Sequence, residues 1–418
     1  MRILAAVAAS IAALAFAGSP PPTPSPCAPD NAGLKLPPGF CASLFADSLN
    51  GPRHLTVAPN GDVFVALGGS RNAKGGVAVL RDADGDGKAE LRTKFGEFYS
   101  SEVQLGNGYL FAENGTAILR YKWTPGAMEP AGEPDTVVTG MPPGGHSAKT
   151  FLLRGDNLYV NQGSRTNSCQ EKDRAPGVKG QQPCPELAER AGIWRYSATK
   201  VGQTPANGEH FAQGIRNAVG MAFEPGSGDL IVMQHGRDQL GDWPGYSVEK
   251  NAETPAEEMF RVTKGSDFGW PYCYFDPELK QKLQAPEYGG DGKTAGTCAD
   301  KKGNIAFFPG HWAPETILFY TGSALPARYK NGAFVVFHGA WNRAPLPLQG
   351  FKVVFQPMAR GRASGPFEVF ADGFYSVENN KPTELGGRPM GLAQGKDGEL
   401  YLSDDSKGRI FRITYTGK

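Results

Sequence analysis

The chain has 418 residues, of which 40% are hydrophobic, and its formal net charge is +1. This length and composition allow a large buried core, and the near-neutral charge argues against a nucleic-acid-binding surface. The 56 glycines and 34 prolines follow no collagen-like period, so they indicate the turns of an all-β chain.

The N-terminal residues have the features of an export signal. Arg2 supplies a short positive region, residues 3–16 form an alanine-rich apolar run, and Ala15-Phe16-Ala17 is a small-x-small cleavage site. The run is too short to span a membrane, and no second apolar run of spanning length follows. We therefore predict a soluble protein that is periplasmic or secreted. Its predicted segments are a signal peptide at 1–17, a stiff proline-rich linker at 18–36 and a catalytic domain at 37–418.

The six cysteines of the chain favour disulfides, because their number is even and the chain carries an export signal. A zinc site is the poorer interpretation, since the sequence contains no CxxC pair. Other connectivities remain open, but pairing of sequence neighbours gives Cys27–Cys41, Cys169–Cys184 and Cys273–Cys298, each closing a local loop.

Strand–turn–strand units recur along the chain. Each joins an apolar strand, a glycine-containing turn and a second strand that alternates with period 2. The six units begin at His54 (HLTVAPNGDVFVAL), Val103 (VQLGNGYLFAENG), Lys149 (KTFLLRGDNLYVNQG), Ala218 (AVGMAFEPGSGDLIVMQHG), near Leu325 (LPARYKNGAFVVFHGAW) and at Gly391 (GLAQGKDGELYLSDD). A third strand follows each unit, and a fourth often ends in a related phrase: FADS at 45–48, FAQG at 211–214 and FADG at 370–373.

Six four-stranded units in this order predict a six-bladed β-propeller, an all-β fold. The last unit has only three C-terminal strands, ending at Tyr415, so the strand that begins at Gly39 is expected to complete it and close the ring. A β-sandwich does not explain the recurring phrase. Two long insertions, Gly241–Glu257 and Phe275–Ala306, are expected either to build or cover a site or to be structureless.

In a propeller, the link from one outer strand to the next inner strand crosses toward the central channel. The links of this chain would bring three arginines, one histidine and an amide together at one mouth of the channel. Such a cluster of cations is costly to bury without an anion, and guanidinium groups suit carboxylates. The links therefore predict a pocket for a planar, carboxylated ligand at one mouth of the channel, with solvated loop arginines as the alternative. The residues on these links are Arg53, Ser101-Glu102, His146, Arg216-Asn217 and Arg388.

Several phrases of the chain resemble the soluble pyrroloquinoline-quinone (PQQ) sugar dehydrogenases, and most of all their sorbosone-dehydrogenase branch. The phrases are GHSAKTFLLRGDNLYVNQG, GIRNAVGMAF, RVTKGSDFGWPYCY, LFYTGSALP, FHGAWNR and GRPMGL, and the likeness covers essentially the whole mature chain. The resemblance implies bound PQQ and Ca²⁺. It also implies oxidation of a sugar, a sorbosone-like aldehyde or a related alcohol by hydride transfer to the quinone. Electrons would pass to a cytochrome c or another periplasmic acceptor.

The resemblance also implies roles for single residues. His146 falls on the family's catalytic base, and Arg216 and Asn217 fall on a pair that contacts the quinone, with Arg216 stabilising the developing oxyanion. Arg388 falls on an arginine that binds a cofactor carboxylate, and Arg53 is expected beside it.

Two further segments carry implied roles. Gly236 and Arg237 fall where two backbone carbonyls hold calcium in the family, and such carbonyls tolerate a change of side chain. Trp341 and Arg343 lie in the segment that supplies a cofactor-binding lysine in glucose dehydrogenases, and we expect Arg343 to take that role. One departure concerns the base: Gly145 replaces a carboxylate, and the sequence offers no other neighbour to orient His146.

A weaker metal signal is the run Asp82, Asp84 and Asp86, which resembles the start of a calcium loop. The twelfth position is Thr93 rather than glutamate, so either an acidic hairpin turn or a second calcium site is expected. Two other functions stay open for the chain. A calcium-dependent, lactonase-like propeller hydrolase is disfavoured because the links hold one candidate acid, Glu102. The other is a non-catalytic binding propeller. For the PQQ-dependent propeller itself we expect a monomer or a weak oligomer.

Overall fold

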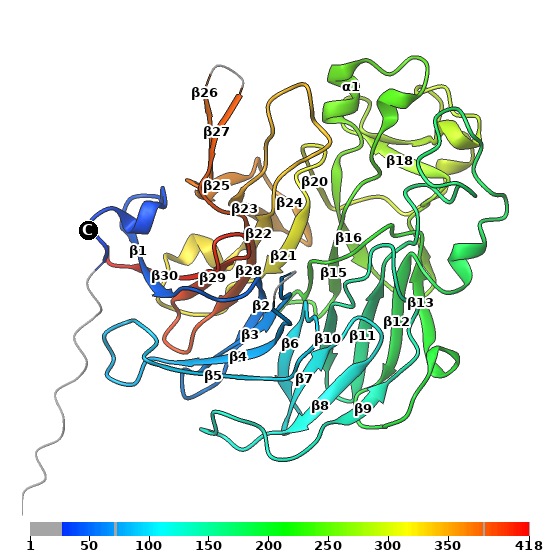
Figure 1. Ribbon diagram of the computed structural model, residues 1–418. Coiled ribbons are helices and arrows are strands. Elements are labelled where there is room, and N and C mark those ends of the chain that lie inside the picture. Colours follow the sequence, from blue (N-terminus) through cyan, green and yellow to red (C-terminus); the bar gives the residue numbers. More distant parts are fainter. Residues whose placement is uncertain (1–26, 71–72, 379–380, 418) are drawn as a thin grey trace, which may run out of the picture.

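The computed structural model describes residues 27–70, 73–378 and 381–417 (Figure 1). The predicted signal peptide at 1–17 and part of the predicted linker lie outside the described residues. Among the described residues, no helix is long and apolar enough to cross a membrane.

The predicted six-bladed propeller is confirmed. The inner strands β2, β6, β10, β14, β21 and β28 form a closed circle, because each contacts the inner strands of both neighbouring blades. Figure 1 shows the six sheets arranged around a common centre. Blades 1 to 3, from the inner to the outer strand, are as follows. Blade 1 is β2 (Pro52–Val57), β3 (Val63–Leu67), β4 (Gly76–Arg81) and β5 (Leu91–Phe95); blade 2 is β6 (Val103–Gly106), β7 (Tyr109–Glu113), β8 (Ile118–Lys122) and β9 (Asp135–Val138); blade 3 is β10 (Phe151–Arg154), β11 (Asn157–Gln162), β12 (Gly192–Ser197) and β13 (Glu209–Gln213), with β17 (Ser266–Asp267) parallel to β13.

The other three blades have the same order. Blade 4 is β14 (Met221–Phe223), β15 (Leu230–Gln234), β16 (Glu257–Val262) and β20 (Ala306–Phe308); blade 5 is β21 (Pro314–Leu318), β22 (Gly332–Phe337), β23 (Lys352–Ala359) and β25 (Glu368–Ala371), with β24 (Arg362–Ala363) paired to β23; blade 6 is β28 (Pro389–Gln394), β29 (Leu400–Asp404), β30 (Arg409–Tyr415) and β1 (Phe40–Ala46). The N-terminal strand closes the ring as predicted, since β1 pairs antiparallel with β30 from Phe40↔Tyr415 onward.

The core lies between the blades, in six apolar clusters that each join two neighbouring sheets. Strand β3 illustrates why its run VFVAL is buried on both faces. Val63 and Val65 pack toward blade 6, whereas Phe64 and Ala66 pack toward blade 2, because successive side chains of a strand point to opposite faces. Full burial of a side chain such as Val or Phe stabilises the fold by about 1.5–3 kcal/mol.

The fifth unit starts earlier than the sequence pattern predicted. Its inner strand is β21, and the stretch near Leu325 instead contains the short helix η7 (Ala327–Lys330). The pattern missed β21 because Pro314 and Glu315 interrupt its apolar run. Proline is tolerated there because it is the first residue of the strand.

The three predicted disulfides are confirmed: Cys27–Cys41, Cys169–Cys184 and Cys273–Cys298. The two insertions are not structureless, and Figure 1 shows α1 and β18 together at one end of the molecule. The remaining elements are α1 (Val248–Glu253), the hairpins β18–β19 (Cys273–Asp276, Gln281–Gln284) and β26–β27 (Tyr375–Glu378, Lys381–Leu385), and the short helices η1 (Asn31–Gly33), η2 (Pro185–Ala188), η3 (Pro205–Asn207), η4 (Leu240–Asp242), η5 (Pro286–Tyr288) and η6 (Gly296–Cys298).

Candidate active site

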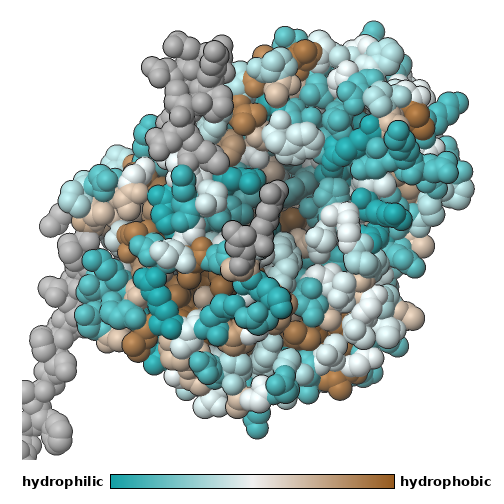
Figure 2. All heavy atoms as spheres, in the orientation of Figure 1, coloured by the Kyte–Doolittle hydropathy of each residue, from teal (hydrophilic) through white to brown (hydrophobic). Residues whose placement is uncertain are grey.

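Strand register brings two sets of links to one mouth of the channel. Because the strands of a blade are antiparallel, the start of an inner strand lies beside the end of the second strand, as in Pro52↔Leu67, Pro314↔Phe337 and Pro389↔Asp404. Residues that precede an inner strand and residues that leave a second strand therefore reach the same face. Figure 2 shows a hollow near the middle of the viewed face, with hydrophilic residues around it.

His146 is held by the end of β11. Its ring Nδ1 lies 2.8 Å from the Ser164 carbonyl oxygen and 3.0 Å from Ser164 Oγ. A carbonyl only accepts, so Nδ1 carries the hydrogen and the lone pair is on Nε2. Burial, together with the nearby Arg216 cation, lowers the pKa of His146 to about 3. The imidazole is therefore neutral at ordinary pH. The structure corrects the expectation that no neighbour orients this ring, because Ser164 does so.

Arg216 lies beside His146 and is almost fully buried. Its guanidinium donates to the Gly236 carbonyl at 2.9 Å and to Asn167 Oδ1 at 3.1 Å, and it pairs with Asp238 at 2.9 Å. Its Nε atom is buried and has no partner among the described residues. The Arg216 carbonyl accepts from Ser164 N at 2.7 Å, which links this residue to the segment that holds His146.

Asn217 completes this side of the mouth. Its side-chain oxygen accepts from Asn161 at 3.1 Å. Gly163 lies between Asn217 and His146, since a Cβ on Gly163 would lie 2.6 Å from His146 Cβ and 2.8 Å from Asn217 Oδ1. The close packing of these three residues needs glycine at 163 and places His146 and Asn217 side by side.

Glu315, the second residue of β21, is the centre of the opposite side. Its carboxylate oxygens lie 3.6 Å from His338 Nδ1, 3.7 Å from Arg53 and 4.0 Å from His235 Nε2. Burial raises the pKa of Glu315, but His235, His338 and Arg53 outweigh burial, and the net pKa is lowered. Glu315 is therefore an anion surrounded by three basic side chains.

Arg388 joins the same cluster through a histidine. Its Nη2 lies 2.7 Å from His338 Nδ1, and His338 Nε2 lies 2.9 Å from Asp405. Arg53 also lies 3.5 Å from Asp405. Asp405 thus lies close to both Arg53 and Arg388, and these two cations help to lower its pKa.

The charge balance of the mouth differs from the sequence expectation. The sequence predicted a cluster of arginines that would need an anionic ligand, but Glu315, Asp405 and Asp238 supply three carboxylates from the protein itself. The Coulomb argument for a carboxylated ligand is correspondingly weaker. Two groups can still bind a ligand: Arg216 Nε, which has no hydrogen-bond partner among the described residues, and His146 Nε2, which carries the lone pair of the ring.

A cavity of about 340 Å³ lies in the channel, lined by His54 and Glu102 together with inner-strand residues. His54 Nδ1 lies 2.8 Å from Glu102, and its Nε2 lies 2.9 Å from the Glu315 carbonyl. Both partners accept, and the pKa of His54 is raised because Glu102 outweighs the effect of burial. Glu102 is therefore ion-paired in the channel.

Arg343 and Trp341 lie apart from this cluster. The Arg343 guanidinium is buried against the Ala252 carbonyl and Glu253 of α1 and against the Pro347 carbonyl. Its donors are therefore directed at the insertion. Trp341 is 62% exposed, and Arg174, an ion-pair partner of Asp238, lies 5.4 Å from its ring centre.

The two carbonyls expected to bind calcium differ in their surroundings. The Gly236 carbonyl already accepts from Arg216, which leaves a single lone pair. The Arg237 side chain turns away to Glu287 and to the Asp238 carbonyl. In the β4–β5 turn, ligand atoms of Asp82, Asp84, Asp86 and Glu90 all lie within 4.8 Å of one another, and Glu90 was absent from the sequence prediction.

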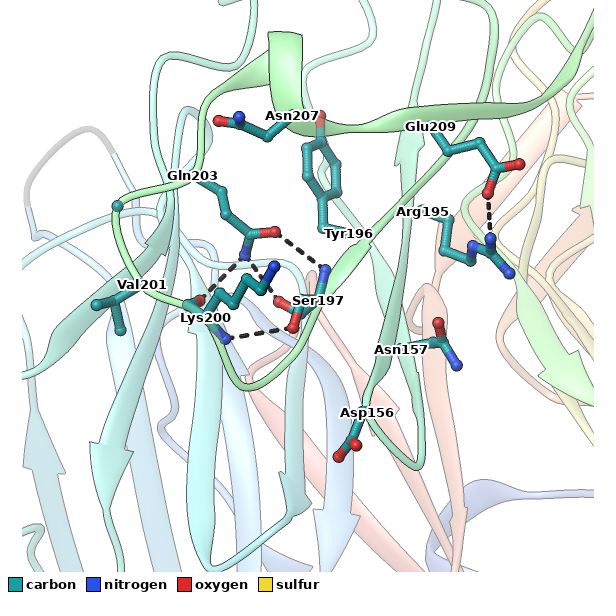
Figure 3. Close-up of a pocket in the computed structure, with 11 residues that line it drawn as sticks. Asp156, Asn157, Arg195, Tyr196, Ser197, Lys200, Val201, Gln203, Asn207 and Glu209 are labelled. Atoms are coloured by element: carbon teal, nitrogen blue, oxygen red, sulfur yellow. Dashed lines mark hydrogen bonds and ion pairs between the residues drawn. The ribbon is translucent and has the colours of Figure 1, made fainter.

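A pocket of about 670 Å³ lies elsewhere, at the edge of blade 3 (Figure 3). Its polar groups are engaged with one another: Arg195 pairs with Glu209, and the Gln203 amide donates to the carbonyls of Ser197 and Lys200. None of the predicted site residues lines this pocket. The mouth of the channel is therefore the better candidate.

Sequence reasoning missed five residues of the site: His235, Asp238, Glu315, His338 and Asp405. Four of them follow the second strand of a blade, in the phrases Gln234-His235-Gly236-Arg237-Asp238, Phe337-His338-Gly339 and Asp404-Asp405. The antiparallel register could have found these four, because it brings the end of the second strand to the same mouth as the start of the first. Glu315 required the correct start of β21.

The fold and site define a six-bladed β-propeller whose channel mouth gathers arginines, histidines and carboxylates around one neutral, half-buried histidine, His146. The family model described as TrAA12-like matches residues 34–416, and the chain belongs to this family.

Two individual proteins are also similar to the chain. A pyrroloquinoline quinone-dependent sugar dehydrogenase of Hypocrea jecorina (strain QM6a) is 23% identical over 394 residues, covering 85% of this chain and 84% of that protein. An uncharacterized protein of Borreliella burgdorferi is 29% identical over 215 residues, which is 50% of this chain and 49% of that protein, so the match spans about half its length.

Solved structures share the fold. The calcium structure of a family AA12 enzyme from Trichoderma reesei has a TM-score of 0.75 at 20% identity, covering 92% of this chain and 97% of that one. The holo PQQ domain of a Coprinopsis cinerea pyranose dehydrogenase has a TM-score of 0.71 at 20% identity, covering 91% and 97%. A PQQ-bound aldose sugar dehydrogenase from Streptomyces coelicolor has a TM-score of 0.57 at 17% identity, covering 91% and 99%.

Proposed function

We propose that this protein is a PQQ- and calcium-dependent oxidoreductase that oxidises a sugar, a sorbosone-like aldehyde or a related alcohol. Membership of the TrAA12-like family supports the class, and the named relatives are PQQ-dependent sugar dehydrogenases. The proposal places the protein outside the cytoplasm, with a cytochrome c or a similar periplasmic protein as its electron acceptor.

The residues at the mouth fit a carboxylated quinone. Arg216 Nε is buried and unpaired, so it is a donor that a bound acceptor would satisfy. Arg388, Arg53 and Asn217 would hold the remaining polar groups of the cofactor, and the exposed Trp341 would contribute from the neighbouring segment. We assign no cofactor contact to Arg343, because its donors are engaged by α1 and Pro347. The carbonyls of Gly236 and Arg237 offer the hard oxygen ligands that Ca²⁺ prefers. A second calcium is proposed at Asp82, Asp84 and Asp86.

The observation that carries the proposal is the tautomer of His146. Because Nδ1 donates to the Ser164 carbonyl, Nε2 is left as a base that can accept the proton of a substrate hydroxyl. The low pKa keeps this nitrogen unprotonated at neutral pH. When bound, the quinone supplies the hydride acceptor and calcium supplies a Lewis acid. The Arg216 cation stabilises negative charge that develops beside His146.

Reconstitution of the purified apoprotein with PQQ and Ca²⁺ tests the proposal. Dye-linked reduction is then measured across aldoses, osones and alcohols. We expect quinone-dependent turnover in the wild type, and loss of turnover with retained cofactor uptake in His146→Ala. The matched control is His210→Ala, because His210 stacks on Trp194 in the outer part of blade 3. Absence of any quinone-dependent spectral change, or lactone hydrolysis without quinone, would overturn the proposal.

A further inference from the structure

The segment at residues 184–190, between β11 and β12 of blade 3, contacts both backbone stretches that flank His146. Arg190 is buried, and its guanidinium donates to the carbonyls of Pro143 at 2.5 Å, Gly144 at 3.1 Å and Gly163 at 3.5 Å. Among the described residues it forms no ion pair. Burying a cation that faces only carbonyls is costly, so its place needs a reason beyond packing. The carbonyls belong to the two backbone stretches that flank His146.

Glu186 acts on the same structure from the other side. Its carboxylate accepts from Arg165 N at 2.6 Å, from Thr166 N at 3.3 Å and from Thr166 Oγ1 at 2.5 Å. The Thr166 carbonyl in turn accepts from Ser164 Oγ at 2.6 Å, and this hydroxyl oxygen accepts from His146 Nδ1. A continuous chain of hydrogen bonds thus runs from Glu186 to the imidazole.

The two backbone stretches, residues 143–146 and residues 164–165, are tightly packed against each other. A Cβ on Gly145, which has φ +63°, would lie 2.5 Å from Arg165 Cα and 2.6 Å from the Ser164 carbonyl. The 143–146 turn therefore lies directly on residues 164–165. Any shift of either stretch moves the Ser164 carbonyl relative to the ring that it orients.

Both residues come from one anchored segment. Arg190 N donates to the Glu186 carbonyl at 2.8 Å, and the Cys169–Cys184 disulfide ties the start of the segment to the loop beyond Thr166. The segment can thus transmit a fixed position to the turn, whereas an isolated surface arginine could not.

We propose that Arg190 and Glu186 are positioning residues for His146, which hold its turn and its Ser164 partner in the arrangement that exposes Nε2 as the base. The inference rests on the proposed function for its catalytic meaning. The segment that carries Arg190 and Glu186 would thus orient His146 in place of the carboxylate that Gly145 replaces. Arg216, His235 and Asp238 also face the ring, and the substitutions below leave these three unchanged.

The test uses the full-length protein and the substitutions Arg190→Met, Arg190→Lys and Glu186→Gln. The control is Arg195→Met, which removes an arginine of the same blade that pairs with Glu209 at the outer edge. Imidazole nitrogens are observed by NMR in the ¹⁵N-histidine-labelled apoprotein, and His146 is assigned by loss of its signals in His146→Gln. The wild type and Arg195→Met should show His146 with hydrogen on Nδ1. Arg190→Met and Glu186→Gln should show a mixture of tautomers.

The second readout is kinetic. With PQQ and Ca²⁺ bound, Arg190→Met should lower kcat by about 100-fold with little change in KM, as expected for a misplaced catalytic group. Arg190→Lys should recover part of the loss. Folded Arg190→Met with the wild-type tautomer and kcat would overturn the inference.

Two further outcomes are decided by the same design. If Arg190→Met does not fold, Glu186→Gln is the deciding variant, and a wild-type tautomer and kcat there would overturn the inference. If the wild type shows no quinone-dependent turnover, the proposed function fails, but the NMR measurement still decides whether the segment positions His146.

Discussion

Replacing Glu315 by glutamine removes the carboxylate at the centre of the mouth and keeps its shape. The side chain is 6% exposed and lies within 4.0 Å of His338, Arg53 and His235. Removing one partner of a buried ion pair costs about 3–5 kcal/mol. A single pair at this separation contributes about 4 kcal/mol at an effective dielectric constant of about 20, which agrees with that range. We expect Glu315→Gln to lower the free energy of unfolding by a similar amount at pH 7.

The loss should depend on pH in a defined direction. The pKa of Glu315 is lowered in the folded protein, since His235, His338 and Arg53 outweigh burial. Its contribution to stability is therefore present above the unfolded carboxyl pKa of about 4.3 and is lost as the pH falls through the folded pKa. Urea unfolding of wild type and variant at pH 7 and near pH 3 measures this. Glu368→Gln, in the exposed pair with Arg328, is the control and should change little. Equal stability of Glu315→Gln and wild type at pH 7 would refute the reasoning.

Three other predictions follow from the same structure. Because the pKa of His146 is lowered to about 3, kcat should stay flat down to about pH 4 and fall only below it. The contribution of His146 to stability should grow as the pH rises from 3 to 6.5. An acidic limb of kcat at pH 6–7 in a folded enzyme would contradict this. The double substitution Cys169→Ser and Cys184→Ser opens a loop with a sequence separation of 15 and should cost about 3 kcal/mol in urea unfolding; an unchanged midpoint would show that the disulfide does not anchor its segment. Phe40→Ala removes a buried ring that packs 5.0 Å from the ring of Phe370, and it should cost about 3–5 kcal/mol and lower Tm; a loss below about 1 kcal/mol would mean that β1 does not close the ring tightly.

The fold could be predicted because its signal is local and repeated. Each blade repeats the same strand order, and second strands such as β3 and β22 are apolar on both faces because they pack between two blades. The strand that begins at Gly39 could be assigned to blade 6 because one blade lacked its outer strand. The exception is β21, where Pro314 and Glu315 break the apolar run.

Residues of the site could be predicted from the sequence only where they lie on a link that leads into an inner strand. His146, Arg216 and Arg388 precede inner strands, so topology alone places them at the mouth. Which carboxylate pairs with which arginine depends on the register between blades, and no short pattern in the sequence encodes the contact of Arg53 with Glu315. The same holds for Arg343, whose partners on α1 come from an insertion that is 90 residues away in the chain.

His146 could be predicted from the sequence, but the residue that orients its ring could not. The phrase Gly145-His146 indicates a turn, but the orienting partner, Ser164, belongs to the end of β11. The interaction exists because residues 143–146 lie on residues 163–165 in three dimensions. Sequence reasoning therefore found His146 and missed what fixes its tautomer.

The most direct test of the account is a single-turnover experiment on the reconstituted protein. PQQ and Ca²⁺ are bound to wild type and to His146→Gln, a substrate from the screen is added, and reduction of the bound quinone is followed by stopped-flow absorbance. The account predicts equal quinone uptake by both proteins, with rapid reduction only in the wild type. Reduction of the quinone in His146→Gln at the wild-type rate would contradict it.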